Sequence, residues 1–392
     1  MRVLFLAPQP FYRLRGVCIA HRRCLEVLSD MGAEVDLLTF PFGSDVEFPL
    51  LSIHRVWRAP GVRDIPIGPS WRKLVQDAFL FLHAAWLCVR RGHEIVHASE
   101  ESAFMAVLLK SVFRFKLIYD MDDVLSARLR RGGFLRAWIL LRLVEALERW
   151  TLRRCDLILT NSLDTTQYAQ RHAAAGSVFF YDHVPPLPAA GLPQAQRREL
   201  RRAWGLEGRR LILYAGNLEP YQGVGLLVRS MSGVLRDCPD AFCLIIGGES
   251  AQIEDLRSLA ERSGVASSLR WLGQRPLEET FQCMQAVDVL VSPMVEEKAV
   301  PMKLYAYLAA GVPIVATDLP NHTQLLDGGR SALVPPCPAA LAAAITRVLA
   351  AVPADMSVPA RADSGPRPDC AADARIIREA YQRVLAGGDG LG

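Results

Sequence analysis

The chain has 392 residues, of which 51% are hydrophobic and 22% are charged, and its formal net charge is only +4. This length predicts two domains, each large enough to bury its own core. The small net charge and the lack of a recognisable RNA or DNA motif argue against a nucleic-acid partner. The nine cysteines form no CxxC pair, and an odd number argues against a disulfide framework, so we expect free thiols in a cytoplasmic protein.

Two apolar segments bear on localisation. The N-terminal MRVLFLAPQP has an apolar run that is too short for a secretory signal and is broken by prolines, so it predicts the first core strand. Ala78–Val89 contains about a dozen largely apolar residues, whereas a membrane-spanning helix needs ~20. We therefore expect Ala78–Val89 to form a buried helix.

The first half of the chain alternates short apolar runs with segments of helical period. Such alternation with short loops predicts a parallel sheet covered by helices on both faces. The predicted strands are Arg2–Ala7, Val35–Phe40, Ile95–Ala98, Lys116–Asp120, Asp156–Thr160 and Val178–Tyr181, and the predicted helices are Cys18–Met31, Trp71–Arg91, Ser102–Phe113 and Phe134–Arg154.

The second half repeats this alternation after a proline-rich break. Pro185–Pro193 predicts an interdomain linker, which separates a first domain at 1–184 from a second at 194–351. The predicted strands of the second domain are Arg210–Ala215, Phe242–Ile246, Leu269–Trp271, Val287–Ser292 and Val312–Thr317, and its predicted helices are Gln194–Trp204, Val224–Asp237, Ile253–Ser263, Leu277–Gln285, Pro301–Gly311 and Pro338–Ala350.

The C-terminal segment combines a polar stretch with one more helix. Residues 352–372 are rich in Pro, Ala, Ser and Asp without an apolar period, which predicts a flexible connection. Asp373–Leu385 is amphipathic, and Asp373 is a candidate N-cap. This helix, within 373–392, either packs back on the first domain or caps the second.

The most informative stretch runs from Glu296 to Pro320. An acidic loop precedes a helix that begins near Pro301 and ends at Gly311, and a short apolar strand follows. The free backbone N–H groups in the first turn of such a helix suit an anion. Lys303 stands in that turn and adds a positive charge.

This stretch resembles the donor loop of glycosyltransferase family 4, the glycosyl transferase group 1 enzymes. The residues in register are Ala309, Gly311, Pro313, Ala316 and Thr317. The resemblance implies the α/β GT-B fold, two Rossmann-like parallel-sheet domains that face a cleft. It also implies a hexosyltransferase that moves a sugar from a nucleotide-diphosphate sugar to a glycan, lipid-linked or small-molecule acceptor with retention, with the donor as co-substrate and without a bound metal or a permanent cofactor.

Several loops match the family's donor site, with departures. In YAGNLEPYQG the neutral Asn217 and Gln222 stand where the family usually has Arg and Lys, and Ala306 stands where it often has Glu. Two charge-assisted contacts to a diphosphate are therefore missing, and Lys303 is the candidate replacement. The donor-binding candidates that the resemblance implies are Gly16, Gly216, Asn217, Gln222, Gly248, Arg275, Glu296, Glu297, Pro301, Met302 and Lys303.

Acidic residues follow two strands of the first domain. In YDMDDVL, Asp122 falls where many family members have a His near the reacting sugar, so Asp122 and Lys303 are the catalytic candidates. A metal site of DxD type is the weaker interpretation, because two carboxylates without further ligands carry little signal. His97 and Glu100 in VHASEE are the acceptor-side candidates that the resemblance implies.

The helix predicted at Phe134–Arg154 carries five arginines among Leu, Ile and Trp residues. Basic amphipathic helices of this kind lie on anionic membranes, although Glu145 and Glu148 interrupt the charge. An anionic membrane surface, at the inner membrane face, is therefore a candidate partner, and a packed helix with a basic exposed face is the alternative.

Two other functions stay open. A catalytically impaired glycosyltransferase-like subunit, used for binding, would explain Asn217, Gln222 and Ala306 together. A nucleotide-sugar epimerase on the same fold fits less well, because the register from Ala309 to Thr317 matches family 4 better. An NAD-dependent dehydrogenase is disfavoured, since no GxGxxG follows a strand.

Overall fold

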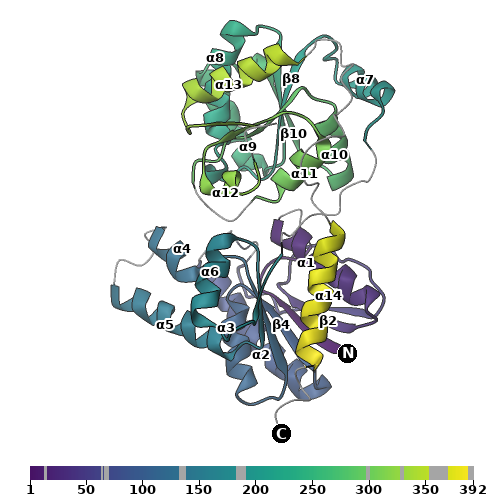
Figure 1. The fold of residues 1–392 in the computed structure, drawn as a ribbon, viewed down its shortest axis with the longest axis vertical. Coiled ribbons are helices and arrows are strands. Elements are labelled where there is room, and N and C mark those ends of the chain that lie inside the picture. The colour runs from purple at the N-terminus through teal and green to yellow at the C-terminus, as the bar shows by residue number, and fades with distance from the viewer. Residues whose placement is uncertain are drawn as a thin grey trace. The chain divides into compact units, whose positions relative to one another are not determined.

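The computed structural model describes residues 1–12, 16–62, 65, 70–131, 138–181, 191–296, 301–326, 331–352 and 370–386. The chain divides into two compact units, residues 1–183 with 371–392 and residues 184–370 (Figure 1). Most of the predicted linker, most of the predicted connection at 352–372 and the donor-loop candidate Glu297 lie outside the described residues.

The first unit is built on a parallel sheet of seven described strands in the order β3-β2-β1-β4-β5-β6-β7. β1 pairs with both β2 and β4, so the order of strands reverses between β1 and β4. Ligands of such sheets bind beyond the carboxyl ends of the strands at this switch point. The strands are β1 (Arg2–Ala7), β2 (Glu34–Thr39), β3 (Leu51–Arg55), β4 (Ile95–Ser99), β5 (Lys116–Met121), β6 (Leu157–Thr160) and β7 (Val178–Phe180).

Helices bury both faces of this sheet. One face packs against α2 (Trp71–Arg91), α3 (Ser102–Lys110), α5 (Trp138–Arg154) and α6 (Leu163–His172). The other face packs against α1 (Gly16–Asp30) and α14 (Cys370–Ala386). The short α4 (Leu125–Arg131) packs on α5. β3, α4 and α6 were not predicted from the sequence.

The helix at the C-terminus is part of the first unit. Ala374, Ile377, Ala380, Tyr381 and Val384 of α14 are buried in the same core as β1 and α1. The prediction that Asp373 caps this helix is wrong, because the helix begins three residues earlier and Asp373 lies buried within its first turn.

The second unit repeats the architecture with a parallel sheet of six described strands in the order β10-β9-β8-β11-β12-β13. Its order reverses between β8 and β11. The strands are β8 (Arg210–Ala215), β9 (Ala241–Ile246), β10 (Leu269–Gly273), β11 (Val289–Ser292), β12 (Ile314–Thr317) and β13 (Ser331–Val334). The two parallel sheets with their covering helices confirm the predicted α/β class.

Helices again cover both faces of the second sheet. α8 (Val224–Asp237), α9 (Ser250–Arg262) and α13 (Pro338–Ala351) contribute to the core on one face. α10 (Leu277–Gln285) and α11 (Lys303–Ala310) contribute to the core on the other. The remaining helices are α7 (Gln194–Ala203) and α12 (Pro320–Thr323). β13 and α12 were not predicted.

The α2 helix corrects one expectation about burial. Leu80, Ala84 and Leu87 are fully buried, as expected of a core helix. However, Leu82 and Val89 are 63% and 71% exposed, so Ala78–Val89 buries only one face. Within the described residues, no helix is both long enough and apolar enough to cross a bilayer.

Candidate functional site

The loop that follows β8 packs very closely on a neighbouring segment. Gly223, which ends the short 3₁₀ turn at Pro220–Gln222, has a left-handed φ of +71°. A Cβ at this position would lie 1.8 Å from the carbonyl oxygen of Pro293, so only glycine fits. α8 begins immediately afterwards, and its first backbone N–H groups have no partner within the helix.

Lys303 meets this loop from the first residue of α11. Its Nζ lies 2.6 Å from Oε1 of Gln222 and 3.4 Å from the hydroxyl of Tyr214. The ammonium also lies 4.4 Å from the centre of the Tyr214 ring. The structure thus brings together two residues that the sequence predicted as parts of one site, Lys303 and Gln222, and adds Tyr214 as the surface on which they meet.

The partners of Lys303 are all neutral. Among the residues that the structure describes, no carboxylate lies within 4.0 Å of its Nζ. Although the side chain as a whole is only partly buried, loss of solvent around the ammonium lowers the pKa of Lys303 to about 7. An anion next to Nζ would favour the protonated form of Lys303.

Two buried tyrosines hold the loop after β8, which Lys303 contacts from α11. The Tyr214 hydroxyl donates a hydrogen bond of 2.6 Å to the carbonyl oxygen of Asn217. The Tyr307 hydroxyl accepts one of 2.9 Å from the backbone N–H of Ala215. Burial raises the pKa of both phenols, so both act as neutral groups. Both tyrosines stand in apolar segments, so the sequence analysis did not identify them as part of the site.

The other donor candidates of the second unit lie at loops around this point. Gly248 has φ +84°, and a Cβ there would lie 2.2 Å from Cδ1 of Leu218. Arg275 is largely exposed and forms an ion pair of 3.6 Å with Glu279. Pro301 and Met302 precede α11 and are partly buried, and Glu296 is exposed. Ala306 is buried in the core on the inner side of α11.

A buried histidine joins the ends of β11 and β12. The Nδ1 of His322 lies 2.6 Å from the carbonyl oxygen of Thr317, and its Nε2 lies 3.0 Å from the hydroxyl of Ser292. Burial lowers the pKa of His322 to about 4, with a smaller contribution from the charge of Lys303. The ring is therefore neutral at pH 7, with Nδ1 donating and Nε2 accepting. The sequence analysis did not single out His322.

In the first unit, Gly16 is exposed and begins α1. Its loop is anchored by Gln9, whose amide nitrogen lies 2.9 Å from Nδ1 of His21. Residues 13–15 of this loop are outside the described part of the chain. Gly16 therefore lies at the carboxyl end of the central strand β1, where a helix N-terminus follows.

The acceptor-side candidate His97 lies in the core, within β4. Its ring is fully buried and stacks on Phe5, with ring centres 4.1 Å apart. Nδ1 lies 2.7 Å from the hydroxyl of Tyr381, and Nε2 lies 3.6 Å from Oδ2 of Asp120. In this position His97 joins α14 to the sheet and has no exposed surface to offer an acceptor.

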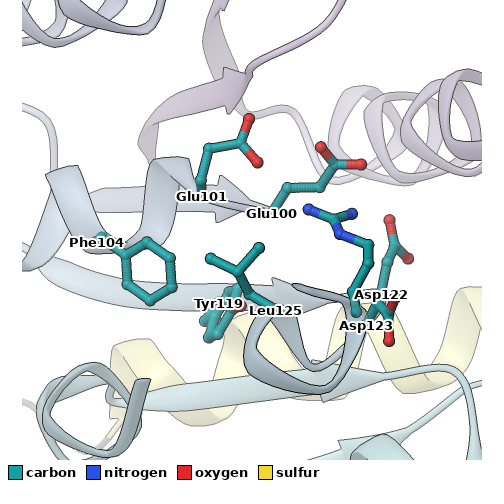
Figure 2. A pocket seen from close by; sticks show the side chains of 8 residues that line it. Glu100, Glu101, Phe104, Tyr119, Asp122, Asp123 and Leu125 are labelled. Atoms are coloured by element: carbon teal, nitrogen blue, oxygen red, sulfur yellow. The ribbon is translucent and has the colours of Figure 1, made fainter. Parts of the chain in front are cut away.

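Asp122 and Glu100 line one pocket at the carboxyl ends of β4 and β5 (Figure 2). Oδ1 of Asp122 accepts a hydrogen bond of 2.8 Å from the side-chain amide of Asn161. Glu100 has a left-handed φ of +49°, which is rare for a non-glycine residue and recurs at functional sites. The lining residues are Glu100, Glu101, Phe104, Tyr119, Asp122, Asp123, Leu125 and Arg128.

The acidic lining is partly balanced by a neighbouring lysine. Lys73 of α2 forms an ion pair with Glu101 and lies 3.8 Å from Asp77. Burial raises the pKa of Asp77 to about 6, while the charge of Lys73 opposes that rise. Within the described residues, no three His, Cys, Asp or Glu side chains are arranged to hold a metal ion.

Two family models match the chain, one in each unit. The "Glycosyl transferase 4-like domain" matches residues 16–180, and "Glycosyl transferases group 1" matches residues 209–351. Phosphatidyl-myo-inositol mannosyltransferase of Mycobacterium leprae is 33% identical over 181 residues, which are 45% of this chain and 47% of that protein. 2-Deoxystreptamine glucosyltransferase of Streptomyces kanamyceticus is 31% identical over 179 residues, 44% of this chain and 46% of that protein. The matches thus span less than half the length of these curated relatives.

Solved structures resemble the chain over nearly its full length. Sucrose-phosphate synthase from Thermosynechococcus elongatus has a TM-score of 0.79 at 19% identity, covering 99% of this chain and 100% of that one. Anabaena HepE in complex with UDP-glucose has a TM-score of 0.74 at 17% identity, covering 98% and 100%. This likeness gives the fold, which is GT-B. With a matched domain in each of its two units, the chain belongs to the group 1, or family 4, glycosyltransferases.

Proposed function

We propose that this protein is a retaining glycosyltransferase that moves a hexose from a nucleotide-diphosphate sugar to a hydroxyl of an acceptor. The bond between the anomeric carbon and the diphosphate breaks, a glycosidic bond to the acceptor oxygen forms, and the acceptor hydroxyl loses its proton. The observation that carries the proposal is Lys303, an ammonium at the start of α11 with only neutral partners among the described residues.

The chemical demand of this reaction is a stabilised leaving diphosphate. Lys303 would supply one positive charge, and the N-termini of α8 and α11 would supply oriented backbone N–H groups. Gln222 is the partner of Lys303 and holds the ammonium in place. We therefore infer that a single lysine replaces the two cations that the β8–α8 loop lacks.

The remaining candidate residues would bind the donor around its diphosphate or contact the sugar and the acceptor. The proposed donor-site residues besides Lys303 are Gly16, Gly216, Asn217, Gln222, Gly248, Arg275, Glu296, Glu297, Pro301 and Met302. Asp122 is the candidate for orienting hydroxyls of the reacting sugar or of the acceptor, because its carboxylate lines the pocket of the first unit. Glu100 lines the same pocket as the acceptor-side candidate, whereas the fully buried His97 has no surface that could touch an acceptor.

Anionic membrane binding at the cytoplasmic face is a further part of the proposal. α5 exposes Ile139, Leu140, Leu143 and Leu147 together with Arg142, Arg153 and Arg154. Apolar side chains flanked by arginines suit a surface of anionic lipid. Flotation with vesicles that contain anionic lipid should carry the protein upward, whereas vesicles of zwitterionic lipid alone should not. Equal sedimentation with both would remove this partner.

Donor binding is tested by a panel of UDP, GDP and ADP and their common sugar conjugates, measured by thermal shift and calorimetry. UDP-glucose comes first, because HepE of the same fold is solved with it. A ligand that binds only the folded state raises the melting temperature. A hit followed by release of the nucleotide with an acceptor supports the transferase. Binding without turnover points to the impaired subunit, and conversion of the donor without an acceptor points to an epimerase.

A further inference from the structure

The pocket in the first unit has an unusual charge for a site that is to take a sugar acceptor. Glu100 and Glu101 come from the end of β4, and Asp122 and Asp123 follow β5, so four carboxylates meet at one edge of the sheet (Figure 2). The cations at the pocket are the lining Arg128 and Lys73, which pairs with Glu101. The four carboxylates and Arg128 give the lining a formal charge of −3, and Lys73 is shared between Glu101 and Asp77, which does not line the pocket.

These carboxylates differ in the hydrogen bonds and ion pairs that they already form within the protein. Glu101 pairs with Lys73, Asp122 accepts from Asn161, and Oδ1 of Asp123 accepts a hydrogen bond of 2.8 Å from the next backbone N–H. Glu100 forms neither a hydrogen bond from its side chain nor an ion pair with any residue in the described ranges. The charges of Glu100 and Lys73 attract each other without a direct contact, so the Glu100 carboxylate is left to bind a cation in the pocket.

Polar groups other than carboxylates also lack partners here. Tyr119 lines the pocket and is only 4% exposed, and its hydroxyl makes no hydrogen bond to a described residue. The Nε of Arg128 is buried and likewise has no partner within the described part of the chain. Buried polar groups are nearly always hydrogen-bonded, so the unsatisfied Nε of Arg128, beside a Tyr119 hydroxyl that bonds to no described residue, indicates a polar ligand.

The rest of the wall is apolar. Phe104, Leu125 and the ring of Tyr119 contribute carbon surface to the pocket (Figure 2). An aromatic face next to carboxylates suits both the C–H side of a sugar ring and a cation. The combination of carboxylates, two free donors and aromatic surface excludes a purely apolar ligand and disfavours an anionic one.

We propose that this pocket, of about 20 Å³, receives the amine-bearing edge of the acceptor, a polyol that carries a protonated amine, such as an amino sugar or an aminocyclitol. The inference rests on the proposed transferase function and names its acceptor class. The ammonium lies against Glu100 with Asp122 and Asp123 nearby, while ring hydroxyls accept from Tyr119 and Arg128. A phosphorylated acceptor is repelled, because its charge has the same sign as the net charge of the pocket.

The test compares ligands that carry a protonated amine with uncharged or phosphorylated ligands built on similar rings. The full-length chain is titrated by calorimetry with glucosamine and N-acetylglucosamine, with 2-deoxystreptamine and myo-inositol, and with glucose 6-phosphate. The amines should bind about tenfold or more tightly than their neutral counterparts, since hydrogen bonds to charged groups are the stronger ones. Equal binding within the pairs, tighter binding of the neutral or phosphorylated ligand, or no binding of either amine would overturn the proposal.

Variants of the pocket locate the effect. Glu100→Gln keeps the shape and removes the charge, so amine affinity should fall about tenfold, and by clearly more than the affinity for the neutral partner. Tyr119→Phe should weaken both members of a pair. The matched control is Glu254→Gln on α9, whose side chain is 71% exposed, and it should change neither. An unchanged amine preference in Glu100→Gln contradicts the assignment.

Salt gives a second measurement that needs no variant. Screening by salt should weaken the binding of the amines and leave the binding of neutral ligands unchanged, and the opposite pattern would also contradict the proposal.

The nucleotide panel separates this inference from the proposed function. If the amines bind but no nucleotide in the panel does, the transferase function is contradicted and the pocket assignment stands. If the nucleotide sugar is turned over only with neutral acceptors, the transferase function stands and the pocket assignment is contradicted.

Discussion

His97 and Tyr381 are 284 residues apart in the sequence, yet Nδ1 of the imidazole lies 2.7 Å from the phenol oxygen. Both side chains are fully buried, and their rings are nearly parallel. A proton on Nε2 faces Asp120, 3.6 Å away, and leaves Nδ1 to accept from the phenol. This contact ties the last helix of the chain to the central strands of the first unit.

Tyr381→Phe should lower the free energy of unfolding of the first unit by about 1–3 kcal/mol. The ring and its packing remain, but Nδ1 of His97 is left buried without a partner. Tyr381→Ala removes the ring as well and should cost about 3–5 kcal/mol. Denaturant unfolding followed by circular dichroism measures both. If Tyr381→Phe is as stable as the parent protein, the hydrogen bond contributes nothing and packing alone holds α14.

The sequence predicted the regular parts of this fold because hydrophobic period and turn residues specify them locally. Arg2–Ala7, Trp71–Arg91, Arg210–Ala215 and Val224–Asp237 form elements with the predicted bounds. β3 was missed because LSIHR mixes polar and apolar residues and its side chains are all only partly buried. The edge of a sheet gives a weak pattern, since neither face is fully covered.

Contacts between distant segments are what the sequence did not predict. Lys303 was identified from its place in the first turn of a predicted helix and Gln222 from a family resemblance, but nothing local shows that they meet on Tyr214. The partnership of His97 with Tyr381 is equally invisible, because each residue stands in an ordinary apolar element. His97 was predicted to be an acceptor-side candidate at the end of a strand, whereas tertiary packing buries its side chain fully in the core.

Gly223→Ala should destabilise the second unit by about 2–4 kcal/mol, because the substitution combines a left-handed φ with a clash against the Pro293 carbonyl. Gly208→Ala is the matched control. Its φ is +74°, but a Cβ there meets nothing within 4 Å, so only the conformational cost of about 1 kcal/mol remains. Thermal unfolding compares the two variants. Equal losses would show that the close approach at Pro293 is relieved by a small shift of the loop.

His322 should make the stability of the second unit depend on pH. The unfolded histidine takes up its proton near pH 6.5, whereas burial keeps the folded one neutral until about pH 4. The stabilisation is thus complete above pH 6.5 and is lost as the pH falls towards 4. Between pH 7 and pH 5 the loss should be about 2 kcal/mol.

His322→Gln is the control for this pH dependence, because glutamine does not titrate. The variant should be less stable at pH 7, since it disturbs the contacts to Ser292 and Thr317, but it should lose about 2 kcal/mol less than the parent between pH 7 and pH 5. Denaturant unfolding at both pH values gives the two differences. Parallel pH profiles for the parent and the variant would mean that His322 titrates normally in the folded state.

Lys303 should control donor affinity and its pH dependence. Lys303→Met keeps the aliphatic stem and removes the ammonium, so the donor found in the nucleotide panel should bind about tenfold to a hundredfold more weakly. Because burial lowers the pKa of Lys303 to about 7, the free protein loses this charge as the pH rises above 7. A bound diphosphate favours the charged form, so binding takes up a proton, and affinity should fall as the pH rises from 7 to 9.

The measurement should use a nucleotide sugar as the ligand, since its diphosphate does not titrate between pH 7 and pH 9. In Lys303→Met the affinity should be flat across that interval. Lys303→Gln separates the charge from hydrogen bonding, and a variant that retains both the affinity and the pH slope of the parent would remove Lys303 from the phosphate site.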